Sequence, residues 1–305
     1  MHRLDALRTF VRVAELASFT QAAESLGLPK ASVSTAVRQL EAWVGTQLLH
    51  RTTRRVRMTE DGRVFYERCK DVLADVDELE HQFSRTRQSL RGRLRVDMPS
   101  GMARHLVLPV LPAFLDAHPQ IELELSATDR RVDLVREGFD CVIRVGGVAD
   151  SSLVARPLGA FRVLTCASPG YLARCGTPRS LDDLRDHRLI HYASSFGGPA
   201  DGFEYPDAGG YRELEMKGAL TVNSAVAYEA ACLAGLGLIQ APLAGTHRLI
   251  EQGLLVEVLP ELQAEPMPVT LLYPHRRHLP RRVSAFMDWV AEVLRPHLAP
   301  MPDGR

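Results

Sequence analysis

The stretch that decides the fold is residues 18–58, SFTQAAESLGLPKASVSTAVRQLEAWVGTQLLHRTTRRVRM. Ser18 and Gln21 have the spacing of a capping box, which begins a helix. Gly27 stands where a short helix should end and the chain needs a positive φ angle. Pro29 then suits the first turn of a second helix, because its missing N–H costs nothing there. The stretch therefore predicts two short helices joined by a glycine turn.

The second of these helices is predicted from about Lys30 to Trp43. One apolar stripe runs along it, formed by Val33, Val37, Leu40 and Val44. The opposite face is small and polar and holds one guanidinium, on Arg38, which could bind a guanine or a phosphate. An ordinary surface helix with a solvated polar face is the alternative interpretation.

A strongly basic segment follows the second helix. Residues 51–57, RTTRRVR, hold four arginines and two threonines and come directly after Leu48 and Leu49. We expect a β-hairpin here, a wing that lies along the phosphate backbone or in the minor groove. Residues 1–58 carry nine basic and four acidic side chains, a net charge of +5; the chain as a whole is neutral, so the remainder carries −5. A basic head on an acidic body favours phosphate binding.

These features resemble the LysR-type transcriptional regulators, a family with a winged helix-turn-helix head. The resemblance also covers Leu4-x-x-Leu7-x-x-Phe10 and Met58-Thr59-x-x-Gly62, so that it extends over about the first 62 residues. Beyond these it is one of length and element order. Where the family often has Gln-Pro-Ala-Val-Ser-Arg, this chain has residues 30–35, KASVST, so the DNA sequence that relatives recognise does not carry over. The candidate DNA-binding residues are Ser18, Thr20, Lys30, Ala31, Ser34, Thr35, Arg38, Arg51, Arg54 and Arg55.

A long helix is predicted from Thr59 to Leu90, because this segment has no proline and one glycine. Apolar residues recur along it at alternating spacings of four and three, with Thr86 as a polar interruption: Phe65, Cys69, Val72, Val76, Leu79, Phe83 and Leu90. This heptad seam predicts a homodimer through a two-helix coiled coil. A helix packed on its own second domain is the alternative. A stripe in the first helix, Leu4, Leu7, Val11 and Ala14, either joins this interface or fills the core of the head.

From residue 93 onward, β-branched runs alternate with helical ones, which predicts a parallel α/β sheet. The chain is expected to leave one lobe near residue 163 and to return to it near residue 268, leaving a cleft between two lobes. The predicted fold class is thus α/β, with a winged helix-turn-helix at 1–58, a linker helix at 59–91 and an effector domain at 92–305. Lobe I comprises 92–163 and 268–300, and lobe II comprises 164–267. The family resemblance implies the same plan, similar to periplasmic solute-binding proteins, and a homotetramer.

Ligands of open α/β sheets lie beyond the carboxyl ends of strands and near helix N-termini. This rule selects as candidate effector-binding residues Ser100, Thr128, Arg144, Ser195, Asn223 and Ser224. Each of them could equally be an ordinary helix cap or turn residue. Arg144 would suit a carboxylate effector, and a structural ion pair is an equal alternative for this guanidinium.

The composition narrows the class of protein. Hydrophobic residues make up 46% and charged residues 24% of the chain, as in ordinary globular proteins. No apolar run is long enough to span a bilayer, and charges interrupt the first helix, so we expect no membrane segment and no signal peptide. The five scattered cysteines favour reduced thiols in the cytoplasm, without zinc or disulfides, although a redox pair of Cys166 and Cys175 is an alternative.

These observations predict a sequence-specific DNA-binding transcriptional regulator that is controlled by a small-molecule effector between two lobes. Its expected partners are double-stranded promoter DNA, the effector, a second copy of the chain and RNA polymerase. No cofactor motif and no catalytic constellation is visible, so we expect no cofactor and no enzyme activity. The rival interpretations are an enzyme with a DNA-binding head and a solute-binding module whose head contacts only proteins.

Overall fold

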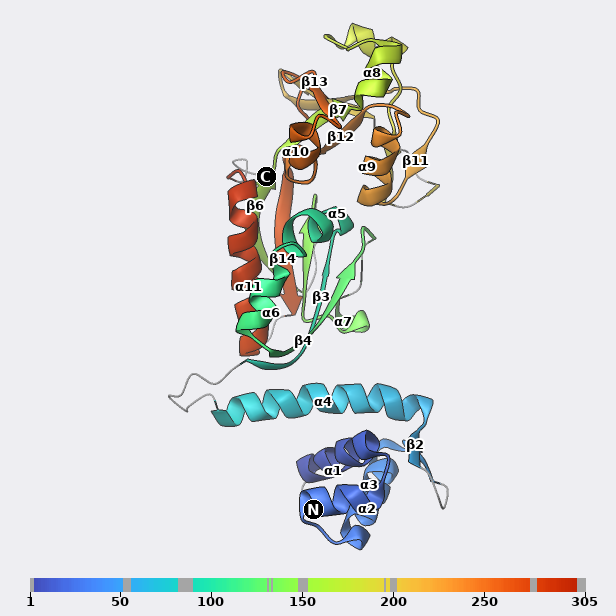
Figure 1. Ribbon diagram of the computed structural model, residues 1–305, viewed down its shortest axis with the longest axis vertical. Coiled ribbons are helices and arrows are strands. Elements are labelled where there is room, and N and C mark those ends of the chain that lie inside the picture. Colours follow the sequence, from blue (N-terminus) through green and yellow to red (C-terminus); the bar gives the residue numbers. More distant parts are fainter. Residues whose placement is uncertain are drawn as a thin grey trace. The chain divides into compact units, whose positions relative to one another are not determined.

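The computed structural model describes residues 3–51, 56–81, 90–130, 132, 134–147, 153–194, 196–197, 202–274 and 279–300 (Figure 1). The chain divides into two compact units, Met1–Arg93 with Gln120–Glu122, and Leu94–Pro119 with Leu123–Arg305. Of the residues named above, Arg54, Arg55, Phe83, Thr86 and Ser195 lie outside the described residues.

The first unit begins with three helices, α1 (Arg3–Leu16), α2 (Phe19–Leu26) and α3 (Lys30–Val44). The Ser18 hydroxyl oxygen caps α2 by accepting a hydrogen bond from the main-chain N of Gln21 at 3.3 Å. Gly27 ends α2 with a φ of 64°, and Gly45 ends α3 in the same left-handed region. A two-stranded antiparallel hairpin follows, β1 (Leu49–Arg51) and β2 (Val56–Met58). The predicted helix pair, glycine turn and wing are confirmed.

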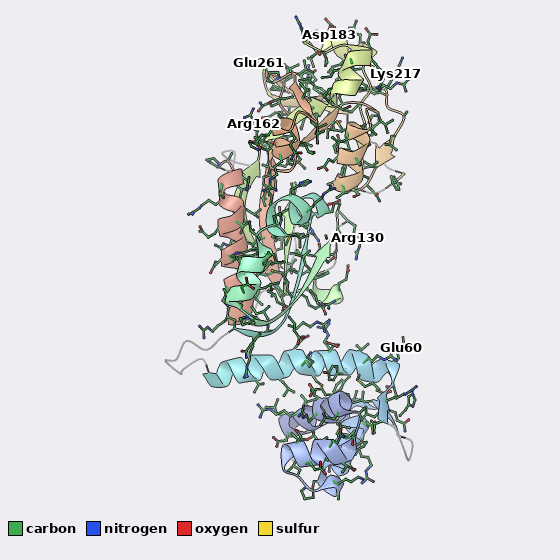
Figure 2. The ribbon with its side chains drawn as sticks, viewed as in Figure 1. Glu60, Arg130, Arg162, Asp183, Lys217 and Glu261 are labelled. Atoms are coloured by element: carbon green, nitrogen blue, oxygen red, sulfur yellow. The ribbon has the colours of Figure 1, made fainter. Side chains whose placement is uncertain are left out.

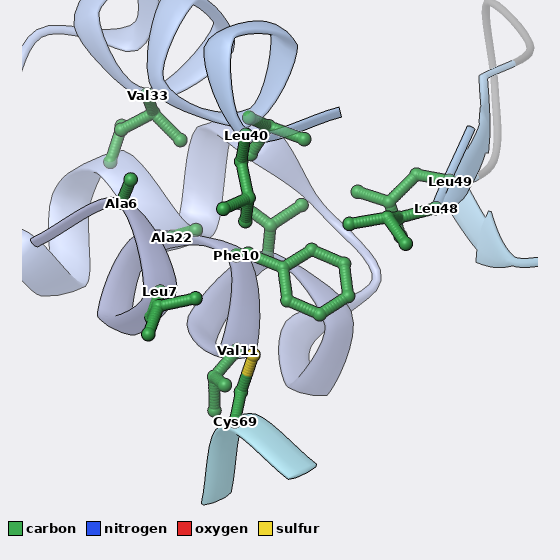
Figure 3. Packing of buried hydrophobic residues seen from close by; sticks show 13 residues of the cluster. Ala6, Leu7, Phe10, Val11, Ala22, Val33, Leu40, Leu48, Leu49 and Cys69 are labelled. Carbon is green, nitrogen blue, oxygen red and sulfur yellow. The ribbon is translucent and has the colours of Figure 1, made fainter. Parts of the chain in front are cut away.

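The core of this unit gathers the apolar faces of α1, α2 and α3 around Phe10, which is completely buried (Figure 3). Val33 and Val37 of α3 are also completely buried, as the predicted stripe requires. Val44, the last residue of that stripe, is exposed because α3 extends beyond the core. Leu7 of α1 packs in the core, so this part of the α1 stripe fills the head. Each large apolar side chain buried here stabilises the head by about 1.5–3 kcal/mol.

Helix α4 (Glu60–His81) shows that the predicted heptad seam is divided between two environments. Its first half packs on the head: the rings of Phe65 and Phe10 lie 5.6 Å apart, and Cys69 is buried beside Val11 (Figure 3). Val72, the next residue of the seam, is 46% exposed. The prediction of one continuous dimer seam was wrong for Phe65 and Cys69, because a heptad pattern identifies an apolar face without specifying what covers it.

The second unit is built around a five-stranded sheet in the order β4 (Gln120–Ala127), β3 (Arg91–Met98), β5 (Cys141–Val145), β14 (Met267–Pro274) and β6 (Leu153–Phe161). Strand β3 runs parallel to β5, but β14 is antiparallel to both β5 and β6. The sheet is therefore mixed, and the prediction of a parallel sheet was wrong. The alternation of strands and helices does not reveal that β14 enters between β5 and β6 from the opposite direction.

Helices surround this sheet, with α11 beside β6 and β14 in Figure 1. Their bounds are α5 (Ser100–Met102), a π-helical turn η1 (Ala103–Val107), α6 (Leu111–Ala117), α7 (Leu134–Glu137), α11 (Arg281–Leu294) and a 3₁₀ turn η3 (Arg295–His297). Phe114 of α6 packs edge-to-face on Phe286 of α11, with ring centroids 5.6 Å apart. This contact joins the two helices in the apolar core of the unit.

A smaller antiparallel sheet has the order β12 (Ile239–Pro242), β7 (Val163–Ala167) and β13 (Val256–Val258). The chain enters it from β6 and returns from β13 to β14. The other elements of this part are α8 (Pro169–Cys175), η2 (Asp182–Asp186), β8 (His191–Tyr192), β9 (Phe203–Asp207), β10 (Gly210–Leu214), β11 (Thr221–Val222), α9 (Ala225–Leu233) and α10 (Leu243–Glu251). Leu164, Ile190 and Ile239 are completely or almost completely buried in its core.

Candidate functional site

The outer face of α3 carries the side chains that were predicted to approach base edges. Lys30, Ala31, Thr35 and Arg38 are exposed, whereas Ser34 is half-buried. The Arg38 Nε lies 3.4 Å from the main-chain oxygen of Ser34, one turn earlier, so the guanidinium lies along the helix surface. Small side chains with two cations, Lys30 and Arg38, make a face that can enter a major groove without a steric block.

The hairpin that follows is tied to α3 by Glu41. Its Oε1 accepts hydrogen bonds from the main-chain N of Leu48 at 3.0 Å and of Leu49 at 3.1 Å. Both leucine side chains are buried in the head core. One carboxylate therefore fixes where the wing leaves α3, and Arg51 ends the first strand of that wing.

Two further predicted residues lie at the start of α2. Thr20 is exposed in the first turn of this helix, and Ser18 is half-buried because its hydroxyl caps the helix. The main-chain N–H groups of a helix start are suited to a phosphate oxygen. Thr20 of α2 is therefore at the surface of the head, as are the exposed residues of α3.

The second unit contains a cavity of ≈ 680 Å³, within the size range of small-molecule sites. Its walls come from the ends of β3, β4 and β5, from η1, from the start of α9 and from β12, so that both sheets contribute to it. Met102, Phe161 and Ile239 supply apolar surface. Tyr192 and Tyr228, which stand edge-to-face with centroids 5.6 Å apart, form an aromatic part of the wall.

Arg144 lines this cavity and is already paired. Its Nη1 lies 2.7 Å from Oδ2 of Asp97, which has no exposed side-chain surface, and Oδ1 of Asp97 accepts a hydrogen bond from the Thr128 hydroxyl at 2.9 Å. The structural ion pair, one of the two alternatives for Arg144, is thus present. The Nη2 of Arg144 is buried and has no hydrogen-bond partner among the described residues.

Asp129, at the end of β4, also lines the cavity. Its Oδ1 accepts a hydrogen bond from the main-chain N of Ser100 at 2.9 Å. Its Oδ2 accepts from the Ser100 hydroxyl at 2.5 Å and from the main-chain N of Ala225 at 2.7 Å. The neighbouring Arg130, labelled in Figure 2, is exposed and pairs with Glu137 at 2.6 Å. Asp129 therefore joins the start of α5 to the start of α9 across the cavity wall.

A second polar contact joins the same two parts. The π-helical turn η1 places the Nε2 of His105 2.7 Å from Oε2 of Glu229, one turn after Ala225 in α9. The Arg104 guanidinium also approaches Glu229, at 3.6 Å. Such π-helical turns are frequent at functional sites because they redirect single side chains.

The smaller sheet contributes a hydrogen-bonded polar group around Gln240. Its Nε2 donates to the main-chain oxygen of Glu204 at 2.7 Å, and its Oε1 accepts from the main-chain N of the same residue at 2.7 Å. The main-chain N of Gln240 lies 3.2 Å from the Tyr228 hydroxyl. These bonds fix the shape of the wall on this side of the cavity.

The sequence rule located this region but not all its members. Thr128 and Arg144 line the cavity, and Ser100 binds Asp129, which lines it. Asn223 is exposed and Ser224 precedes α9, and their neighbour Ala225 lines the cavity in their place. The candidate set did not include His105, Glu229 and Gln240, since they lie inside helices or strands where no local signal distinguishes them from core residues.

The cysteines give no support to a Cys166–Cys175 pair. Cys175 is exposed, whereas Cys166 is completely buried and lies beside Cys232. Contact with Cys232 and burial raise the pKa of the Cys166 thiol, and burial raises that of Cys69 to about 12. Thiols with raised pKa values are poor nucleophiles.

Within the described ranges no cluster of three or more metal-ligating side chains occurs, and none of the described helices is long and apolar enough to cross a bilayer.

Two family models match the chain. "Bacterial regulatory helix-turn-helix protein, lysR family" covers residues 4–63, and "LysR substrate binding domain" covers residues 87–295. The first includes the exposed face of α3 and the second includes the whole cavity. The predicted order of a DNA-binding head followed by a ligand-binding domain is confirmed by these matches.

Relatives match over nearly the full length. The chain is 47% identical to the HTH-type transcriptional regulator YhjC of Escherichia coli, covering 98% of this chain and 100% of that one. It is 38% identical to an HTH-type transcriptional repressor of Pseudomonas aeruginosa, covering 96% and 92%. Among solved structures, CrgA of Neisseria meningitidis, titled a LysR-type transcriptional regulator, matches with a TM-score of 0.61 and 30% identity over 95% of this chain and 98% of that chain. The predicted fold class is thereby confirmed.

Proposed function

Because the chain belongs to the LysR family of transcriptional regulators, we propose that α3 reads promoter DNA and that the cavity of the second unit holds the controlling effector. Proteins of this family bind DNA and small-molecule effectors, form oligomers and are regulators rather than enzymes. The single observation that carries the proposal is the two-sided character of α3. Val33 and Val37 anchor one side in the core, and Thr35 and Arg38 project from the other.

The proposed division of labour within the head follows from chemistry. Thr35, Arg38 and Ala31 would contact base edges and so determine sequence preference. The wing arginines Arg51, Arg54 and Arg55 would contact phosphates and so supply affinity that depends on salt. Ser18, Thr20, Lys30 and Ser34 flank the base-reading face and complete the proposed DNA-binding set.

We place the domains at 1–58, 59–91 and 92–305, with the effector domain formed by lobe I (92–163 and 268–300) and lobe II (164–267). An effector in the cavity would favour one arrangement of the two lobes over others, which is a shift of population between existing states. In an oligomer that shift would change the spacing of the heads, and hence the bending of promoter DNA and the access of RNA polymerase to it. This activity requires a protein of the cytoplasm.

The proposed dimer forms through α4, and a homotetramer would pair two such dimers. Val64 is 65% exposed and Val72 is 46% exposed, which leaves apolar surface on α4 away from the head core. Two heads related by a two-fold axis would read an inverted repeat. Replacing both valines by glutamate should convert the dimer to monomer in sedimentation experiments, and an unchanged sedimentation coefficient would place the interface elsewhere. Arg63→Glu, at the exposed position that precedes Val64, serves as the control.

A mobility-shift experiment on the DNA upstream of the protein's own gene, at two salt concentrations, tests DNA binding. Arg54→Ala should weaken binding to every sequence alike and flatten the salt dependence, since each lost phosphate contact reduces the salt slope by about one. Arg38→Ala and Thr35→Ala should instead change the ranking of operator variants. Absence of any shift at low salt would favour a head that contacts only proteins.

The effector is tested by thermal unfolding in the presence of a panel of small molecules. A ligand that binds only the folded state raises the Tm by mass action. A ligand of the cavity should lose its effect when Ala244→Trp fills part of the cavity, because this half-buried side chain lines it. A ligand that is chemically converted during incubation would instead indicate an enzyme.

A further inference from the structure

The two helical segments that meet at the cavity wall both lack a cap of their own. Residue 99, before α5, is a proline, and Ser224, before α9, makes no side-chain cap hydrogen bond. The first N–H groups of a helix need acceptors and attract negative charge. Asp129 meets this need from a third segment of the chain, with its three hydrogen bonds to Ser100 and Ala225 at 2.5–2.9 Å.

The carboxylate of Asp129 thus occupies the position in the wall that an anionic ligand would be expected to use. It is bound by two main-chain N–H groups and one hydroxyl, the kind of donors that recognise carboxylates and phosphates at helix N-termini. Two guanidinium groups of the wall are paired as well: that of Arg144 lies 2.7 Å from Asp97, and that of Arg130 lies 2.6 Å from Glu137. These anion-receptive positions are therefore engaged by carboxylates of the protein.

Other acidic residues add negative charge to the wall. Glu204, Glu213 and Glu265 also line the cavity. An anionic ligand that binds these donors would have to displace Asp129 or Asp97, and the acidic residues of the wall would also repel it. A ligand without negative charge encounters neither obstacle, and it can use the apolar surface and the aromatic pair.

We propose that Asp129 is a specificity-determining residue of the cavity: it serves as an internal carboxylate that holds the two sides together and restricts the cavity to ligands without an anionic group. Removal of this side chain should therefore create a site for a small carboxylate. The inference rests on the proposed function in one respect, namely that the cavity binds a ligand. The hydrogen bonds of Asp129 to its donors do not depend on DNA binding.

Chemical rescue in the full-length protein tests this. Asp129→Ala leaves three donors without an acceptor and should lower the Tm of the second unit by about 5 °C. Titration with sodium formate should restore most of that loss along a saturating curve, because the anion binds only the folded variant. Sodium chloride at equal ionic strength should restore much less. The wild type should show no saturable response to formate.

Two further variants keep the test decisive. In Asp129→Asn the amide still fills the position, so the Tm should fall by less than in Asp129→Ala and formate should have no saturable effect. In Ser100→Ala/Asp129→Ala one donor is lost, so rescue should need several-fold more formate. Asp116→Ala, which removes an exposed carboxylate from the same unit, should respond like the wild type. If Asp129→Ala yields no soluble protein, the same comparison is made on the yield of refolding in formate and in chloride.

Two results would overturn the proposal. One is an equal saturable stabilisation of the wild type and Asp129→Ala by formate, which would mean that anions bind without removal of Asp129. The other is an Asp129→Ala variant that keeps the wild-type Tm and ignores formate. Because the readout contains no DNA, a failed mobility shift would refute the regulatory function and leave this result standing.

Discussion

The link between the recognition helix and the wing gives the sharpest prediction of stability. Glu41→Ala removes the acceptor for the main-chain N–H groups of Leu48 and Leu49, at 3.0 and 3.1 Å. A hydrogen bond to a charged acceptor contributes about 1.5–3 kcal/mol, and the half-buried position of Glu41 admits some water in compensation, so we expect a loss of about 2–4 kcal/mol. A head of this size has a total stability of only a few kcal/mol, on the order of 3–5. The variant should therefore be close to unfolding in the head alone.

The two tryptophans of the chain allow each unit to be observed separately. Trp43 lies in the head, with the Arg3 guanidinium 4.5 Å from its ring, and Trp289 lies in α11 of the second unit. In a Trp289→Phe background, fluorescence during urea unfolding reports the head. Glu41→Ala should lower the midpoint by about 1–2 M urea, given the slopes usual for small domains.

Glu41→Gln is the matched variant, because its amide oxygen can still accept from both N–H groups. It should lose only about 1 kcal/mol, the difference between a charged and a neutral acceptor. Glu24→Ala, which removes an exposed glutamate from α2, should leave the midpoint unchanged. The reasoning fails if Glu41→Ala unfolds at the wild-type midpoint, or if Glu41→Gln is as unstable as Glu41→Ala.

Three other perturbations follow from the structure. Gly62→Ala should destabilise the head by about 1–3 kcal/mol in the same urea assay, because a Cβ at this position would lie 1.9 Å from the main-chain oxygen of Leu48. Arg144→Met should cost the second unit about 3–5 kcal/mol, since it leaves Asp97 charged and completely buried, and unfolding followed by Trp289 in a Trp43→Phe background measures this. The second unit should also lose stability in acid, because burial lowers the pKa of His187 in the folded protein. As the pH falls below about 6.5, the unfolded chain therefore takes up the proton first, and unfolding becomes more favourable. His187→Asn should flatten this decline of the Tm in thermal unfolding.

Each of these has a control within the chain. Gly147→Ala meets no atom within 4 Å and should leave stability unchanged. Asp97→Asn combined with Arg144→Met should recover most of the loss, and failure of the pair to couple would contradict the buried ion pair. In the pH experiment, a wild-type protein that loses more stability at alkaline than at acid pH would contradict the assignment to His187. Burial also lowers the pKa of His297, so the His187→Asn variant should keep part of the acid sensitivity.

Several elements of the second unit carried signals that a closer inspection of the sequence could have used. The hairpin of β9 and β10 turns at Ala208-Gly209, and a glycine-containing turn between two short strands is a hairpin signal. Helix α8 begins with Ser168-Pro169, a favourable start for a helix. The missed residues of the cavity are different in kind, because nothing near His105 or Glu229 in sequence indicates that they meet at 2.7 Å.

The sequence by itself determined the DNA-binding head and its outward face. Ser18, Gly27 and the spacing of Val33 and Val37 act within one or two turns of helix, and interactions over so short a distance in the chain can be recognised from residue type and period alone. The tertiary structure alone decided what covers each apolar or charged group. It placed Cys69 of the linker helix against the head core. It also brought Asp129 to Ala225 across nearly a hundred residues, a contact that depends on the path of the chain through two sheets and therefore leaves no local pattern in the sequence.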